Sequence, residues 1–307
     1  MLFFVDNFSS DAYNNNMFGF YDSYFKFFGL TVTYYGFLIA LAMGMGVFIA
    51  CKLAKLRGLK SDDILLLACY ILPLAILGAR TYYVIFSGES YSFLEFFKIW
   101  EGGLAILGGV IGGAVAIILF CLIHKKNFLD IADIAIISLI LGQGIGRIGC
   151  YFAGCCYGIE VTDPSLMWFP LSTKIHGVWH LSTFFYESFS CFVIFGIFMF
   201  LILKKVKTRG IMSSLYLICY GTVRFILEAL RDESESLYLG SVKFSQLLSG
   251  LMVVGGIILL VLIICEKKGL IKFNKKIAKA NDAENESTSS EEKTSEIENK
   301  NWQISQN

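Results

Sequence analysis

Six ionisable residues lie within or at the rim of long apolar runs in this sequence, where a charge costs a few kcal/mol or more and usually serves a function. They are Arg80, Arg147, Glu187, Arg224, Glu228 and Arg231. Arg224 and Glu228 are four residues apart and share a helix face, which Arg231 continues at the next turn. A buried ion pair with an outward-reaching arginine would explain these three residues alone. It does not explain the whole set, in which arginines outnumber glutamates.

Excess positive charge in a cavity of low dielectric constant calls for an anion from outside. Arginine forks match the geometry of phosphate oxygens, and the phosphate most available at membrane depth is a phospholipid headgroup. We therefore predict that these arginines bind a phospholipid. Tyr35, early in the first apolar run, either presents its phenol to the same cavity or is an interfacial aromatic residue.

A cysteine cluster directly follows Arg147. Its members are Cys150, Cys155 and Cys156. They form packing contacts or a disulfide, or one of them is a thiolate nucleophile or base whose pKa the arginine lowers. A third reading is a metal site with His176 or His180, but the spacing fits no regular metal motif.

Membrane helices must position these residues. The 307 residues are 56% hydrophobic and only 17% charged, which is too apolar for an ordinary soluble domain. A helical crossing needs about 20 apolar residues. Runs of that length cover 30–54, 64–86, 103–123, 130–148, 182–203, 211–230 and 242–265. The sequence therefore predicts an all-α polytopic membrane protein with seven transmembrane helices.

The basic residues predict the orientation of these helices. Lysine and arginine concentrate after the first, third, fifth and seventh runs, within 52–60, 125–126, 204–209 and 267–279. Because cytoplasmic loops carry this excess, we expect the N-terminus outside, the C-terminus inside, and the six ionisable residues in the external half. Basic residues confined to the membrane flanks give no support for nucleic-acid binding.

The chain is expected to have three parts. Residues 1–28 lack a basic region ahead of an apolar run and read as an interfacial segment rather than a cleavable signal. Residues 29–266 form the transmembrane domain, in which the long connection 149–180 is a small extracytoplasmic head. Residues 267–307 are a basic and then disordered cytoplasmic tail.

From about Val32 to Glu266 the sequence resembles the prolipoprotein diacylglyceryl transferase family. The landmarks are Tyr35-Gly36, Gly78-Ala79-Arg80, Trp100-Glu101-Gly102-Gly103, Gly142-Gln143, Gly146-Arg147-Ile148-Gly149, Gly154, Gly158, Tyr186-Glu187, Tyr220-Gly221 with Arg224, Glu228 and Arg231, and Gln246. Each landmark alone is weak, whereas their ordered series with a matching topology is specific.

The resemblance implies a transferase of the bacterial cytoplasmic membrane, with its active site toward the outer leaflet. Such an enzyme moves the diacylglyceryl group of phosphatidylglycerol to the lipobox cysteine of a preprolipoprotein signal peptide, without cofactor or metal. By resemblance, Arg147 and Arg224 hold the phosphate and stabilise the charge that develops on it. The other implied substrate-binding residues are Arg80, Tyr35, Gly149, Glu187, Glu228 and Arg231.

The sequence also departs from the family pattern. The usual histidine before a Gly-Gly pair is Leu107 here, ahead of Gly108-Gly109. Further departures are Gly149-Cys150-Tyr151, Gly154-Cys155-Cys156 and Leu181-Ser182-Thr183-Phe184, with His180 one residue from the histidine position. Two alternatives follow: a related lipid or acyl transferase that uses the cysteine cluster covalently, or a non-catalytic lipid-binding or thiol-redox membrane protein.

Overall fold

The computed structural model describes residues 24–27, 30–87, 92–97, 103–175, 177–204, 208–231, 238–239 and 242–268. The chain divides into two compact units, Met1–Leu260 and Val261–Asn307. Of the predicted N-terminal segment only residues 24–27 are described, and of the predicted tail only residues 267 and 268. His176 and the landmark residues 100–102 lie outside the described residues.

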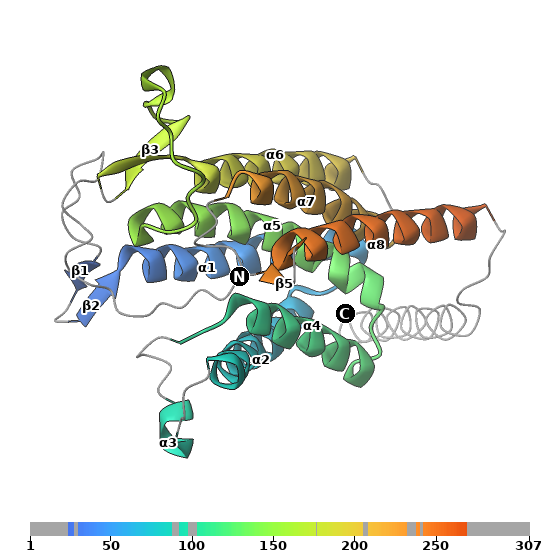
Figure 1. The fold of residues 1–307 in the computed structure, drawn as a ribbon. Helices are drawn as coiled ribbons and strands as arrows, with labels where there is room; N and C mark the ends of the chain where they lie inside the picture. Colours follow the sequence, from blue (N-terminus) through green and yellow to red (C-terminus); the bar gives the residue numbers. More distant parts are fainter. Residues whose placement is uncertain are drawn as a thin grey trace, which may run out of the picture. The chain divides into compact units, whose positions relative to one another are not determined.

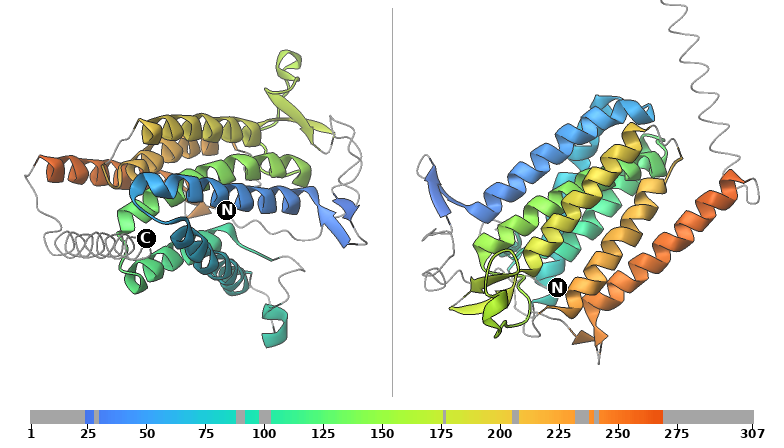
Figure 2. Two further views of the ribbon diagram at one scale, coloured as in Figure 1. Left: turned by 180° about the vertical axis from the view of Figure 1, so that it is seen from behind. Right: turned by 90° about the horizontal axis from the view of Figure 1, so that it is seen from above.

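Seven of the helices among the described residues are long and apolar enough to cross a membrane, which confirms the predicted fold class. They are α1 (Tyr34–Ala54), α2 (Ser61–Phe86), α4 (Ile106–Ile123), α5 (Phe128–Ala153), α6 (Thr183–Leu203), α7 (Ile211–Ala229) and α8 (Phe244–Lys267). A 3-10 turn, η2 (Lys55–Arg57), extends α1, and the short helix α3 (Phe93–Phe96) lies between α2 and α4. Figures 1 and 2 show α5 running beside α1 and α6.

The boundaries differ from the predicted spans at two places that matter for the site. Residues 30–33 are strand β2 (Leu30–Thr33), paired antiparallel with β1 (Tyr24–Phe27), and α1 begins only at Tyr34. The Thr33 side chain caps this helix by accepting a hydrogen bond from the Gly36 amide at 3.1 Å. Helix α5 continues to Ala153, so Arg147 lies inside the helix rather than at its end. Hydropathy marks the apolar part of a span, whereas capping decides where the helix stops.

Helix α5 forms the centre of the first unit. It packs against α1, α6 and α7, and its isoleucines are buried on several faces, among them Ile131, Ile134, Ile137 and Ile140. Burial on several faces suits such a central position. One core cluster joins α5 to α6 and α7 through Cys191, Phe198 and Met212, while another joins it to α1, α2 and α4.

Helices α2 and α4 approach each other through glycines. A Cβ atom built on Gly78 would clash with the Gly108 carbonyl oxygen, and one on Gly112 would clash with that of Leu74. Small residues allow this backbone contact, which is a common basis of helix association in membranes.

The connection between α5 and α6 forms a small head. It contains the 3-10 turn η4 (Pro164–Leu166) and the hairpin of β3 (Ser172–Ile175) and β4 (Val178–Leu181), paired antiparallel with Ser172 opposite Leu181. Isolated bridges join Glu160 to His180 and Gly158 to Arg231. The second bridge fastens the head to the end of α7, before the short strands β5 (Tyr238–Leu239) and β6 (Val242–Lys243).

Candidate functional site

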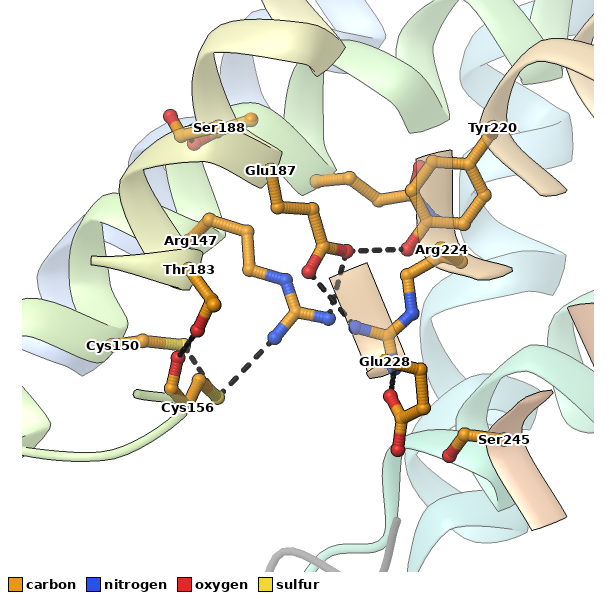
Figure 3. Close-up of polar contacts among 12 residues, drawn as sticks. Arg147, Cys150, Cys156, Thr183, Glu187, Ser188, Tyr220, Arg224, Glu228 and Ser245 are labelled. Atoms are coloured by element: carbon orange, nitrogen blue, oxygen red, sulfur yellow. Dashed lines mark hydrogen bonds and ion pairs between the residues drawn. The ribbon is translucent and has the colours of Figure 1, made fainter. Parts of the chain in front are cut away.

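Glu187 joins three transmembrane helices through one buried carboxylate (Figure 3). It lies in the second turn of α6 and is only 3% exposed. Arg147 from α5 and Arg224 from α7 reach it at 3.0 and 2.9 Å, and the Tyr220 hydroxyl donates to it at 2.9 Å. Both arginines are thereby turned toward one point. This is the meeting of Arg147 and Arg224 that the sequence predicted.

Glu228 extends the network along α7. Its Oε2 lies 2.8 Å from Arg224 Nη2 and 3.9 Å from Arg231 Nη1, and the residue is 2% exposed. Arg231 lies just past the end of α7, in the bridge with Gly158. We call these five residues the arginine cluster: Arg147, Glu187, Arg224, Glu228 and Arg231. Among the described residues, three guanidinium groups face two carboxylates there.

Lys243 adds a cation that the sequence analysis missed. Its Nζ donates to the carbonyl oxygens of Glu228 and Arg231 at 3.3 and 3.2 Å. The residue lies in β6, directly before the last span, and nothing in the local sequence relates it to α7. The only signal in the sequence that could have identified Lys243 is its position: it is one of few charged residues at the rim of a span.

Arg80 is held in a different environment from the one predicted. Its Nε and Nη1 donate to the carbonyls of Phe96 and Gly103 at 3.0 and 3.1 Å, and its Nη2 donates to that of Glu95 at 2.7 Å. The guanidinium also lies over the Tyr83 ring at 5.7 Å. The described contacts therefore place Arg80 at the connection from α2 to α4, outside the arginine cluster, and its substrate-binding role stays a prediction.

Tyr35 and Gly149 lie together beside the cysteine cluster. A Cβ atom on Gly149 would come within 2.8 Å of the Tyr35 ring, so only glycine lets α1 and α5 meet there. Tyr35 packs against the buried group that contains Cys150, Cys156 and Phe184. Leu107, which stands where the family usually has a histidine, lies in the first turn of α4.

The cysteine cluster adjoins the arginine cluster through Arg147. Arg147 Nη1 donates to Cys156 Sγ at 3.2 Å, and Cys156 Sγ lies 3.4 Å from Cys150 Sγ and 3.8 Å from Cys155 Sγ. All three cysteines are free thiols. Burial raises the pKa of Cys156 to about 12, and hydrogen bonds with the other two thiols raise the pKa of Cys155. Both groups are therefore protonated at neutral pH, which weighs against either of them as a resting thiolate nucleophile.

His180 belongs to the head. Its Nδ1 lies 3.1 Å from the Gly158 carbonyl oxygen, and its ring packs against Tyr157 with centroids 4.6 Å apart. Its described contacts link the hairpin to the chain after α5.

Seven helices able to cross a membrane, with buried arginines and glutamates gathered near the ends of three of them, define a polytopic membrane protein with a charged group within its helical part. Residues 22–262 match the family model described as prolipoprotein diacylglyceryl transferase. The chain belongs to this family and is a transferase.

Individual relatives agree with the family. A protein of Finegoldia magna is 39% identical over 254 residues, which cover 82% of this chain and 98% of that protein. A protein of Clostridium botulinum is 37% identical over 245 residues, covering 78% and 95%, respectively. Both are named phosphatidylglycerol–prolipoprotein diacylglyceryl transferase. The resemblance stated from the sequence is thereby confirmed.

Proposed function

We propose that this chain moves the diacylglyceryl group of phosphatidylglycerol to the lipobox cysteine of a preprolipoprotein signal peptide. In this reaction the thiol sulfur forms a bond to the glyceryl carbon of the lipid. The bond from that carbon to the phosphate oxygen breaks, the thiol proton is lost, and glycerol phosphate leaves. The single observation that carries the proposal is the shared carboxylate of Glu187, which turns Arg147 and Arg224 toward the same point.

The arginine cluster suits the leaving phosphate. Each guanidinium carries five N–H donors in a planar fork, which matches the geometry of phosphate oxygens. Donors fixed before the reaction stabilise charge as it develops, and in a site of low dielectric constant they lose little energy to reorganisation. Arg147 and Arg224 are therefore the proposed catalytic residues. Glu187 and Glu228 hold the guanidinium groups in place, and Tyr35 and Gly149 line the adjoining lipid site.

The membrane orientation supports access from the outer leaflet. The arginine cluster lies where α5 and α7 end and α6 begins, whereas Lys52, Lys125 and Arg209 lie near the opposite ends of the helices. Because the end richer in lysine and arginine faces the cytoplasm, the cluster belongs to the external half. Phosphatidylglycerol of the outer leaflet would reach it there.

The acceptor thiol needs no histidine at the position of Leu107 if the cationic cluster lowers its pKa. A thiol next to arginines ionises more readily, and the thiolate is the attacking species. Hydroxide then removes the proton, and the transfer rate rises with pH through the ionisation range of the bound thiol.

Transfer of labelled diacylglycerol tests the proposal directly. The purified chain is mixed with phosphatidylglycerol labelled in its acyl chains and with a lipobox peptide, and a peptide with serine in place of cysteine is the control. We expect label on the cysteine peptide only, and a loss of about 10²- to 10³-fold in Arg147→Ala, as for other preorganised oxyanion donors. Arg209→Ala, an arginine in a different ion-pair network, is the matched control and should retain transfer.

Other outcomes point to the alternatives. Label trapped on Cys150, Cys155 or Cys156 would indicate a covalent transferase. A folded wild-type protein that transfers no label would refute the proposed reaction and favour a non-catalytic lipid-binding or redox role.

A further inference from the structure

We propose that Cys150, Cys155 and Cys156 form a three-thiolate binding site for a thiophilic divalent metal ion of the Zn²⁺ class. The three Sγ atoms all lie within 4.8 Å of one another. Zn–S bonds of about 2.3 Å in tetrahedral directions place sulfur atoms about 3.8 Å apart. The observed separations of 3.4 and 3.8 Å from Cys156 lie close to that value. Small side-chain rotations would bring all three sulfurs to one ion.

The backbone after α5 is shaped to gather these sulfurs. Gly154 ends the helix in the left-handed region at φ +60°, and its N–H donates to the carbonyls of Cys150 and Tyr151. The chain thereby turns back, and the Cys155 N–H donates to the Cys150 carbonyl at 3.1 Å. Sequence spacing alone gave no metal motif, because this reversal, rather than a regular repeat, brings the cysteines together.

Cys156 supplies the second, independent observation. Its φ of +63° is one of two positive values among the non-glycine residues that the structure describes. The Thr183 hydroxyl holds this conformation by donating to the Cys156 carbonyl at 2.8 Å. Side chains rarely adopt such a backbone conformation, and it is typically found at functional sites. Here it turns Sγ toward Cys150 and Arg147.

The surroundings suit a coordinated thiolate better than a disulfide. A disulfide uses two sulfurs, whereas three converge here. The Arg147 guanidinium at 3.2 Å from Cys156 Sγ is a charged donor of the kind that supports a metal ligand from the outer shell. Cys150 and Cys156 are buried, and Cys155 is half-buried and offers a path of entry.

The charges are also complementary. Three thiolates around a divalent ion carry one negative charge, and the positively charged Arg147 guanidinium lies 3.2 Å from Cys156 Sγ. Three protein ligands leave the fourth tetrahedral position for water, as in zinc sites that remain open. The proposal that the site binds a metal ion does not rest on the proposed function. One consequence of metal binding does rest on it: a bound ion would draw Arg147 away from the phosphate of the lipid, and transfer would slow.

Cadmium titration of the full chain tests the site. The protein is purified in detergent, reduced, stripped with a chelator and titrated with Cd²⁺, and the sulfur-to-cadmium charge-transfer band is followed in the ultraviolet. We expect one ion per chain and loss of the band in Cys150→Ser, Cys155→Ser and Cys156→Ser. Cys69→Ser, which removes an exposed cysteine from α2, is the matched control and should keep it.

A second measurement uses the unmodified protein and so does not depend on the folding of any variant. Bound Cd²⁺ should protect Cys155 from alkylation, and a chelator should restore its reactivity. A band that persists in the triple serine variant would overturn the proposal. So would a Cys150–Cys156 disulfide in protein alkylated before lysis, together with no band after reduction. Either result leaves the proposed transfer reaction intact.

Discussion

Two groups of charged residues lie toward opposite ends of α5, and they differ in the partners that they hold. The aspartate cluster is Arg57, Asp130, Asp133 and Arg209. Its ion pairs are Arg57 with Asp133 at 3.0 Å, Arg57 with Asp130 at 3.8 Å and Arg209 with Asp130 at 2.9 Å. Its described members are two cations and two anions. The described members of the arginine cluster are three cations and two anions, and Lys243 lies next to them.

The partners of the two clusters differ as well. Asp133 is fully buried and accepts hydrogen bonds from the Gly210 and Ser213 amides at 2.9 and 3.0 Å, so it fixes the first turn of α7. Arg57 Nη1 donates to the Thr208 carbonyl at 3.4 Å. The aspartate cluster thus ties loops to helix ends. In the arginine cluster, the ion pairs of Glu187 and Glu228 with Arg147 and Arg224 join side chains of α5, α6 and α7. The aspartate cluster therefore serves the fold, whereas the arginine cluster brings charged side chains of three helices to one carboxylate, where we propose that the phosphate binds.

The largest effect on stability should come from the aspartate cluster. Asp133→Ala removes the partner of a buried guanidinium and of two helix amides. Breaking such a buried pair costs about 3–5 kcal/mol, and we expect a loss of that size in the free energy of unfolding, measured by titration with a denaturing detergent. Transfer per folded molecule should be unchanged. A folded Asp133→Ala protein without transfer activity would break the division between the two clusters.

A lysine substitution in the arginine cluster should have a smaller effect, and it tests whether the transfer rate depends on the geometry of the guanidinium or only on its charge. Arg224→Lys keeps the positive charge but loses the fork that reaches Glu187 and Glu228 together. We expect transfer to fall by about 10- to 100-fold, equivalent to about 1.4–2.8 kcal/mol of transition-state stabilisation.

Arg209→Lys is the matched change in the aspartate cluster. The Arg209 side chain is 53% exposed, and exposed ion pairs contribute about 0–1 kcal/mol. We expect neither transfer nor stability to change much. Equal losses of transfer in both lysine variants would show that the fork of Arg224 has no special role.

The sequence was informative where membrane physics restricts the choice of residue. A guanidinium within an apolar run is rare enough for Arg147 and Arg224 to be identified individually, and the fold class followed from the number of runs. Their common partner could not be predicted, because Glu187 comes from a third helix and its position depends on how α5, α6 and α7 pack.

Loops explain the remaining differences. Arg80 also lies within an apolar run, yet its guanidinium binds the carbonyls of Glu95 and Phe96 in α3, and no pattern in the sequence predicts that these carbonyls come within its reach. Lys243 reaches α7 only because the short strands before α8 bring it there. The convergence of the three cysteines depends on positive φ angles at Gly154 and Cys156, which spacing alone does not reveal.

The smallest effect is expected for Tyr220→Phe, which tests whether Glu187 alone positions the two arginines. Tyr220→Phe removes only the hydroxyl that donates to Glu187 Oε1, the oxygen that also pairs with Arg147. One such hydrogen bond is worth about 0.5–1.5 kcal/mol, and somewhat more when the acceptor is charged. Because the carboxylate keeps both arginines, the cluster should stay assembled, and the transfer rate should fall by no more than about tenfold. The ratio kcat/KM, measured over a series of phosphatidylglycerol concentrations, checks this. A loss as large as that of Arg147→Ala would mean that Tyr220 itself contacts the reacting groups, and Glu187 would then be only one of two residues that organise the site.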